Sequence, residues 1–255
     1  MCLILLAYKQ HPDYPVILAA NRDELFARPT AKADFWDEYP AILAGRDLRQ
    51  NGTWLGVDHR GRLAAVTNYR QPPLAKKGLV SRGLLVRDFL LANDSADHYV
   101  SSIKDKLDRY DGFNLFVGDQ GGISVLSSHK KKTYRLEAGV HGISNGELDV
   151  AWPKVVKGKQ ALSAELDTGK AVDPENLLRF LTDSAIPDDN VLPQTGVGLD
   201  LERRLAPVFV SGDDYGTRSS TVLIIDKEGL LSFTERSYDV DGNAQSTVHY
   251  EFQIV

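Results

Sequence analysis

The first 21 residues hold two apolar runs, Cys2 to Tyr8 and Pro15 to Asn21. Between them lies a polar connector, residues 9–14, that contains turn-forming residues. Two short apolar runs joined by a turn predict a β-hairpin with both strands buried. The hairpin constrains everything near it, because the end of its second strand must lie beside the start of its first.

The rest of the chain changes from strand-like to helix-like periodicity and back. We expect further strands at residues 53–58, 62–69, 114–119, 122–128, 133–136, 140–144, 220–226, 230–238 and 247–254, and helices at 84–90, 99–107, 152–166 and 173–182. Ser81 is expected to cap the first helix, and Gly61 to form a tight turn. Two β-rich ends around a helical middle predict one domain, residues 1–255, in which stacked sheets are covered by helices.

Composition and charge exclude several classes of protein. Hydrophobic residues make up 42% of the chain and charged residues 25%, which is typical of a soluble globular protein. The net charge of −5 argues against nucleic acid as a partner, and the only basic run, Lys130-Lys131-Lys132, fits a solvated hairpin turn. The apolar start is too short to span a membrane, and one cysteine cannot form a disulfide within the chain. We therefore expect a cytoplasmic protein without an integral membrane segment.

Cys2 is the only cysteine and directly follows the only methionine, Met1. Removal of Met1 would leave a cysteine that carries both a thiol and a free α-amine. Their reference pKa values are about 8.5 and about 7.7–8.0, so the amine can accept the thiol proton near neutral pH. The alternative interpretation is that Cys2 is a small buried apolar residue.

An N-terminal thiol that attacks a carbonyl needs a group that holds its amine, donors for the oxyanion and a clamp for the substrate. The segment Asn21-Arg22-Asp23-Glu24 follows the second strand of the hairpin and should lie near Cys2. Asp23 is the candidate for holding the amine, and Arg22 for polarising the thiol or binding an acyl carbonyl. A surface turn with a local salt bridge is the alternative for this segment.

Two asparagines end other expected strands. The side-chain N–H groups of Asn68 and Asn145 are suitable oxyanion donors, although asparagine is also common in turns. Arg218 enters the last sheet and is a candidate clamp for an anionic or carbonyl group, or else a surface pairing residue. His141 is the best candidate histidine for binding a ligand, with a core or turn role as the alternative.

Several blocks of sequence, taken together, carry a family resemblance. They are Cys2, Asn21-Arg22-Asp23-Glu24, Gly52-Thr53-Trp54-Leu55-Gly56, Thr67-Asn68-Tyr69, Ser144-Asn145 with Trp152-Pro153-Lys154, and Tyr215-Gly216-Thr217-Arg218. The chain resembles the NRDE family, also called the transport and Golgi organisation protein 2 family. More distantly, it is similar to choloylglycine hydrolases and penicillin V acylases, which are N-terminal nucleophile hydrolases. The resemblance implies an α+β, four-layer αββα sandwich of two antiparallel sheets.

The resemblance also implies roles for individual residues. Cys2 would be the nucleophile, Asp23 would contact its amine, Asn68 and Asn145 would be active-site asparagines, and Arg218 loosely matches a late catalytic arginine. The candidate substrate-binding residues are Asn21, Arg22, Glu24, Tyr69 and His141. The related hydrolases have an arginine three residues before the aspartate, where this chain has Ala20, and Arg22 is the arginine available here. Adjacent strand residues point to opposite faces, so the strand register decides whether Arg22 reaches Cys2.

Two functions follow from the resemblance. The first is a hydrolase or acyltransferase that acts on an amide or thioester of a small acyl compound. The second is a non-catalytic carrier of haem, acyl-CoA or lipid, because the family is linked with the handling of these ligands. No cofactor or metal is expected, and haem enters only as a candidate cargo. The six histidines are scattered and no haem-attachment motif is present, so the sequence itself supports haem only weakly.

Overall fold

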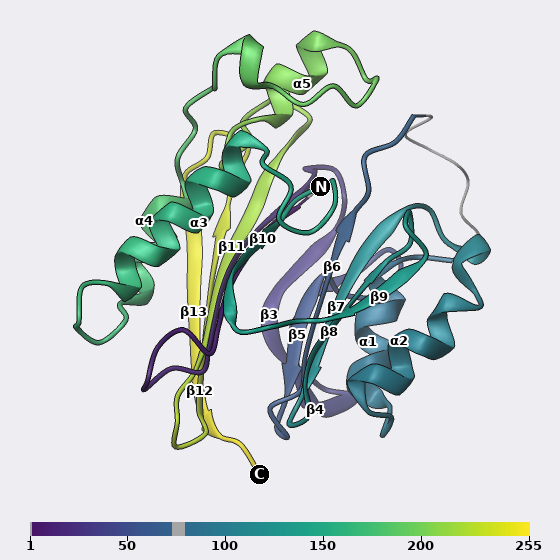
Figure 1. The fold of residues 1–255 in the computed structure, drawn as a ribbon, viewed down its shortest axis with the longest axis vertical. Coiled ribbons are helices and arrows are strands. Elements are labelled where there is room, and N and C mark those ends of the chain that lie inside the picture. The colour runs from purple at the N-terminus through teal and green to yellow at the C-terminus, as the bar shows by residue number, and fades with distance from the viewer. Residues whose placement is uncertain (1, 73–79) are drawn as a thin grey trace. The chain divides into compact units, whose positions relative to one another are not determined.

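The computed structural model describes residues 2–72 and 80–255, which form two compact units (Figure 1). The first unit comprises Met1–Ala27, Arg70–Pro72 and Ala138–Glu251. The second comprises Arg28–Tyr69, Pro73–Glu137 and Phe252–Val255. Met1, whose removal the nucleophile hypothesis requires, lies outside the described residues.

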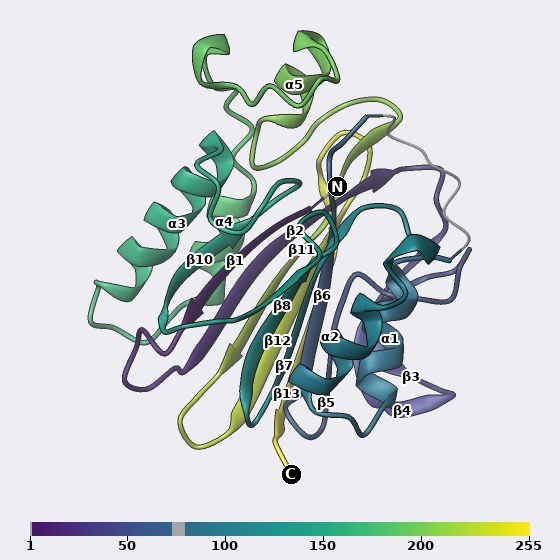
Figure 2. The same cartoon turned by 45° about the vertical axis from the view of Figure 1, so that its right-hand side comes forward.

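A six-stranded sheet forms the base of the first unit, with the strand order β10-β1-β2-β11-β12-β13. Its strands are β1 (Cys2–Tyr8), β2 (Val16–Leu25), β10 (Gly139–Ile143), β11 (Tyr215–Ile225), β12 (Leu230–Tyr238) and β13 (Ala244–Gln253). The expected hairpin is confirmed, because β1 and β2 pair antiparallel from Cys2 opposite Arg22 to Tyr8 opposite Val16. Figure 2 shows β10, β1, β2 and β11 next to one another. The start of β1 therefore pairs with β2 at Cys2, and β10 joins it on the other side from Ile4 onward.

Helices α3 (Pro153–Leu166) and α4 (Pro174–Leu181) pack on this sheet, and α5 (Leu199–Leu205) belongs to the same unit. Helix α4 begins at a proline, and the side chain of Asp173 accepts a hydrogen bond from the N–H of Glu175 at 2.9 Å, which caps the helix. The core between helices and sheet is apolar. It includes Leu3, Leu5 and Ala19 from the strands, and Val155, Leu162, Leu177 and Leu178 from the helices.

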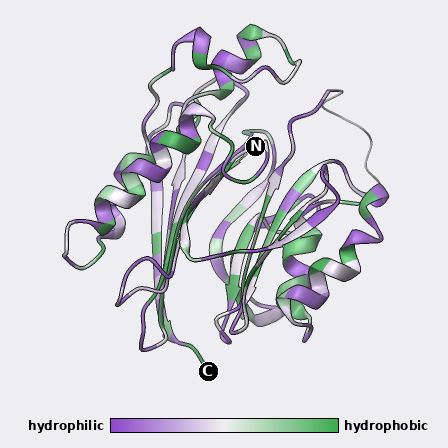
Figure 3. Cartoon of the chain, in the orientation of Figure 1, coloured by the Kyte–Doolittle hydropathy of each residue, from purple (hydrophilic) through white to green (hydrophobic). Residues whose placement is uncertain are grey.

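The second unit contains a seven-stranded sheet whose strands follow one another in sequence order. They are β3 (Thr30–Trp36), β4 (Tyr39–Asp47), β5 (Leu55–Asp58), β6 (Leu63–Asn68), β7 (Phe113–Asp119), β8 (Gly122–Ser127) and β9 (Lys132–Arg135). Helices α1 (Gly83–Leu91) and α2 (Ala96–Lys104) contact this sheet and share an apolar core with it. Hydrophobic residues, green in Figure 3, lie along the strands and on α1.

The structure corrects the sequence expectations at several places. Strand β2 continues through Asn21-Arg22-Asp23-Glu24, so this segment is part of a strand and does not follow one. Strands β3 and β4 and helix α5 were not expected. Residue Ser81 does not cap α1, whose N-cap is Arg82 without a side-chain hydrogen bond. The turn at Gly61 is confirmed, with a φ of 72° that favours glycine.

Within the part of the chain that the structure describes, no helix is long and apolar enough to cross a membrane. The described residues also contain no group of three or more His, Cys, Asp or Glu side chains placed to hold a metal ion.

Candidate functional site

Cys2 and Arg22 stand directly opposite each other in the antiparallel pair of β1 and β2. Directly opposite residues place their side chains on the same face of a sheet, so Arg22 shares a face with Cys2. Arg22 is buried, and its positive charge acts to lower the pKa of the Cys2 thiol. The register thus answers the question that the sequence left open: Arg22 is within electrostatic reach of Cys2.

The Cys2 thiol is nevertheless not activated by this arrangement alone. Burial raises the pKa of the thiol above its ordinary value, while the charge of Arg22 and a hydrogen bond from the backbone of Asp23 act in the opposite direction. A thiol with a raised pKa is almost entirely protonated at neutral pH. The site therefore needs a base, or further positive charge, before Cys2 can act as a nucleophile.

Asp23 is buried on the other face of β2, next to the start of β1. Its Oδ1 accepts a hydrogen bond from Thr217 Oγ1 at 2.8 Å, and its backbone carbonyl accepts one from Tyr215 Oη at 3.0 Å. Both partners come from β11, where Thr217 is the register partner of Asp23. Burial raises the pKa of the Asp23 carboxyl, and the positive charge of Lys154 opposes that rise.

Asn145 is fully buried just after β10, the other neighbour of β1. Its backbone carbonyl accepts a hydrogen bond from the N–H of Arg70 at 2.7 Å, and its Oδ1 lies 3.5 Å from Arg70 Nη2. The preceding hydroxyl, Ser144 Oγ, donates to the carbonyl of Cys2 at 3.0 Å. Asn145 Oδ1 thus faces the positive charge of Arg70, and a side-chain amide N–H is the kind of donor that an oxyanion site requires.

A buried ion pair holds Arg70 in this position. Arg70 Nη1 lies 2.5 Å from Glu202 Oε2, and the guanidinium lies over the ring of Trp152, 5.0 Å from its centre. The other carboxylate oxygen of Glu202 accepts hydrogen bonds from the N–H and the hydroxyl of Thr195, at 2.9 Å and 2.5 Å. Helix α5 is thereby connected, through Arg70, to the backbone and side chain of Asn145.

Lys154, the second residue of α3, is a further charged group of this site. It is only 3% exposed, and no described residue accepts a hydrogen bond from its Nζ. Burial lowers the pKa of the amine to about 8, and the negative charge of Asp23 and that of a Cys2 thiolate oppose the fall.

Other residues proposed from the sequence are held by contacts within the protein. Asn21 Nδ2 donates to the carbonyls of Leu181 and Val208, at 2.8 Å and 2.9 Å, and its Oδ1 accepts from Ser220 Oγ at 2.6 Å. These contacts fasten β2 to its surroundings, so we leave Asn21 out of the proposed site. Glu24 Oε1 accepts a hydrogen bond from the N–H of the next residue, at 2.9 Å.

Arg218 and His141 each contact other residues of the first unit. Arg218 lies at a register shift of β11, and its Nη1 donates to the carbonyls of Leu25 and Phe26 at 2.9 Å and 3.2 Å. His141 Nδ1 lies 2.8 Å from Asp149 Oδ2. Both geometries fit a role in positioning the chain.

The second unit contains Asn68 and Tyr69. Asn68 is the last residue of β6 and lies opposite Phe113, and the ring of Tyr69 stacks on that of His129 with 4.4 Å between the centres. Their proposed roles toward Cys2 remain predictions from the sequence.

Sequence reasoning missed Arg70, Lys154, Thr217 and Glu202. Lys154 and Thr217 stood inside the blocks that carry the family resemblance, and Arg70 directly follows one of them. Their position in these blocks was the available signal. Glu202 gave none, because its partner is 132 residues away.

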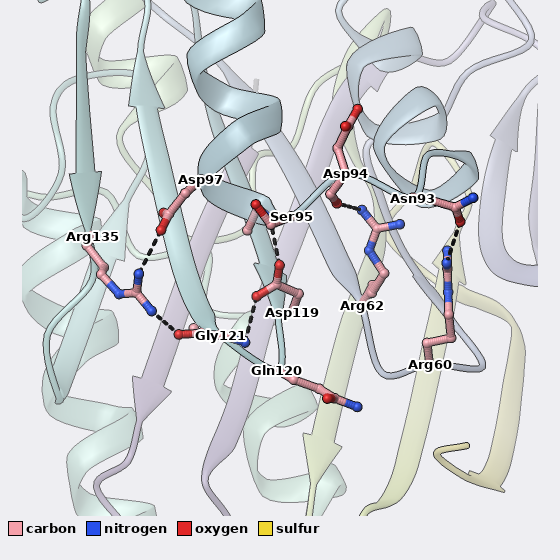
Figure 4. Close-up of a pocket in the computed structure, with 12 residues that line it drawn as sticks. Arg60, Arg62, Asn93, Asp94, Ser95, Asp97, Asp119, Gln120, Gly121 and Arg135 are labelled. Atoms are coloured by element: carbon pink, nitrogen blue, oxygen red, sulfur yellow. Dashed lines mark hydrogen bonds and ion pairs between the residues drawn. The ribbon is translucent and has the colours of Figure 1, made fainter.

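The second unit also contains a polar cavity of about 410 Å³ (Figure 4). Its charged groups are paired with one another and with the backbone: Arg135 with Asp97, Arg62 with the carbonyl of Asp94, and Asp119 with the N–H of Ala96. These contacts hold the end of α1 and the start of α2 in place. We therefore interpret the charged residues of this cavity as structural.

Comparison with solved structures identifies the fold. The chain is similar in fold to the Caenorhabditis elegans N-acylethanolamine-hydrolyzing acid amidase ortholog, with a TM-score of 0.54, 14% identity, and coverage of 88% of this chain and 92% of that one. This confirms the expected fold, an α+β arrangement with two antiparallel sheets like that of N-terminal nucleophile hydrolases.

Sequence comparison identifies the family. The chain belongs to the Transport and Golgi organisation 2 family, whose sequence profile matches residues 1–240. It is 34% identical to the human Transport and Golgi organization protein 2 homolog over 275 residues, which covers all of this chain and 99% of the relative. It is 27% identical to Transport and Golgi organization protein 2 of Drosophila melanogaster, over 93% of this chain and 92% of that protein.

Proposed function

We propose that this protein is an N-terminal cysteine hydrolase or acyltransferase that acts on the amide or thioester of a small acyl compound. The observation that carries the proposal is the convergence of Arg22, Asp23 and Asn145 on the start of β1, where Cys2 lies. The fold shared with an acid amidase supports the same chemistry. That neighbour is named as hydrolysing N-acylethanolamines, so an acyl amide is the first substrate class to test.

In the proposed reaction, removal of Met1 makes Cys2 the N-terminal residue. Its α-amine takes the proton from the thiol, and the thiolate forms a bond to the acyl carbon. The amide N–H of Asn145 donates to the resulting oxyanion, and Asn68 is the second donor that the sequence predicts. The leaving amine or thiol departs with the proton held by the α-ammonium. Water, or an acceptor molecule, then releases the acyl group from Cys2.

Asp23 has a separate role in this proposal. Its buried carboxylate lies next to the start of β1 and holds the α-ammonium of Cys2 by charge. Thr217 and Tyr215 fix its position. We further propose a cytoplasmic location, which the single cysteine supports.

Mass spectrometry of the intact protein tests the proposal. Protein without Met1 is incubated with an acyl thioester, and we expect one acyl group on Cys2 that hydroxylamine removes. The Cys2→Ala variant should gain no such group, and Lys157→Met, which changes an exposed residue of α3, should behave as wild type. Retention of Met1 in the purified protein, or the absence of any Cys2 adduct in protein without Met1, would overturn the proposal. Binding of haem or acyl-CoA that is equally tight in wild type and Cys2→Ala would then favour the carrier function.

A further inference from the structure

Glu202 is a buried acid on a short helix whose other charged residues are exposed. Helix α5 is seven residues long, and Asp200 and Arg203 pair on its exposed side at 3.2 Å. Glu202 is only 3% exposed, and its carboxylate contacts Arg70 through one oxygen and Thr195 through the other. A buried ion pair is on average no more stabilising than well-packed apolar side chains of similar volume. We therefore looked for a geometric role of this pair.

The other contacts of Arg70 converge on Asn145. The backbone N–H of Arg70 donates to the Asn145 carbonyl at 2.7 Å, and Arg70 Nη2 lies 3.5 Å from Asn145 Oδ1. The ring of Trp152, 5.0 Å from the guanidinium, limits the movement of Arg70 on a further side. One arginine, held by Glu202, thus contacts both the main chain and the side chain of Asn145.

The guanidinium of Arg70 is the group that sets the orientation of the Asn145 amide. Ser144 Oγ also lies 3.3 Å from Asn145 Oδ1, but a hydroxyl has one proton to donate and the Cys2 carbonyl, at 3.0 Å, is the nearer acceptor. A guanidinium group only donates, so it attracts the amide oxygen and repels the amide N–H groups. With Oδ1 turned toward Arg70, the planar amide directs its N–H bonds away from this cation.

Asn145 lies beside the start of β1. Strand β10 pairs with β1 as far as Ile143 opposite Ile4, and the hydrogen bond from Ser144 Oγ to the Cys2 carbonyl keeps the two segments together beyond that point. Continuing this antiparallel register by two residues brings Asn145 level with Cys2. A displacement of Asn145 would therefore move its amide relative to the thiol.

We propose that Arg70 and Glu202 are positioning residues for the oxyanion donor: Glu202 fixes Arg70, and Arg70 fixes the orientation of the Asn145 amide beside Cys2. Both act through Asn145 and not on the reacting atoms. The proposal deepens the proposed function and rests on it, because Asn145 must be the oxyanion donor. It makes α5 a determinant of kcat, although this helix lies almost 200 residues after Cys2 in the sequence.

Two variants separate positioning from stability. In Glu202→Gln the guanidinium stays but loses its carboxylate, whereas the double variant Arg70→Met/Glu202→Leu leaves no buried charge and keeps the volume filled. Arg203→Met is the matched control from the exposed side of α5. With the acyl donor that modifies Cys2, both variants should lower kcat about tenfold with KM within about twofold of wild type, and Arg203→Met should match wild type.

Alkylation of Cys2 by iodoacetamide distinguishes positioning from general damage to the site. The thiolate displaces iodide from a CH₂ carbon, so no oxyanion forms and no oxyanion donor is needed. The full chain has no other thiol, and intact mass therefore reports this reaction alone. The alkylation rate should stay within about twofold of wild type in all variants. A loss of alkylation as large as the loss of acyl transfer overturns the inference, and so does a wild-type kcat in the double variant.

NMR spectroscopy provides a measurement that needs no acyl donor. The side-chain amide resonances of Asn145, assigned by their absence in Asn145→Ala, should shift in Glu202→Gln and keep their wild-type positions in Arg203→Met. Unchanged resonances in Glu202→Gln overturn the inference whatever the activity. If the resonances shift as expected but wild-type protein gains no acyl group, the positioning of Asn145 is supported and the proposed function fails.

Discussion

Arg70 and Glu202 form an ion pair in the interior of the first unit, although 132 residues separate them in the sequence. Their side chains are 1% and 4% exposed. Arg70 also donates its backbone N–H to the carbonyl of Asn145. The pair thus connects α5 with the residue that we propose as an oxyanion donor.

Replacing Glu202 with glutamine should lower the free energy of unfolding by about 3–5 kcal/mol, because it leaves the Arg70 charge buried without its counter-ion. Urea denaturation followed by circular dichroism measures the change. Arg203→Met is a suitable control from the same helix, since Arg203 pairs with Asp189 at the surface and such pairs contribute about 0–1 kcal/mol. Similar losses in the two variants would contradict the prediction.

Lys154 should make the stability of the protein depend on alkaline pH. Its pKa is about 8 in the folded protein and 10.5 as a reference value, so the unfolded chain binds more protons between these pH values. Stability should therefore rise with pH from about 8 to about 10. At about 1.4 kcal/mol per pKa unit, the contribution reaches about 3 kcal/mol. The free energy of unfolding is compared for the single variant Cys2→Ser and the double variant Cys2→Ser/Lys154→Met. Both lack the thiol, so only the titration of Lys154 distinguishes them. A constant difference between the two over this range would argue against the prediction.

Gly52 lies against the backbone of Gly83, and a Cβ at position 52 would come within 2.5 Å of the Gly83 carbonyl carbon. Gly52→Ala should therefore lower the free energy of unfolding by about 1–3 kcal/mol through overpacking. At Gly121 the nearest atom to such a Cβ is a side-chain oxygen of Asp119, so Gly121→Ala should cost clearly less. Thermal unfolding of both variants checks the order, and the reverse order would refute it.

Asn145→Ala should lower kcat for acyl transfer about 100- to 1000-fold with little change in KM, because the amide acts mainly on the oxyanion. Steady-state kinetics with the acyl donor that modifies Cys2 measures both constants, with Lys157→Met as the control. A fall of less than about threefold in kcat would exclude Asn145 as an oxyanion donor.

The β1–β2 hairpin was predictable because its apolar runs end in a clear turn. The extension of β2 was not, because the polar residues after Ala20 interrupt the apolar pattern. Their burial depends on contacts with distant parts of the chain, such as that of Asp23 with Thr217. The same reason applies to Lys154: a lysine in the first turn of a helix is normally exposed, and only the packing of α3 on the sheet buries it.

The segment Asn21-Arg22-Asp23-Glu24 spans two environments because it is a strand. Residues 21 and 23 point to one face of β2 and residues 22 and 24 to the other. The four residues of this segment therefore lie in two environments. One is the face of the sheet on which the helices pack, and the other is the face that carries the Cys2 side chain. Substitution of Asn21, which donates to the carbonyls of Leu181 and Val208, should mainly lower the stability, whereas substitution of Arg22 or Asp23 should mainly lower the reactivity of Cys2. An average tolerance for the four positions would describe neither effect.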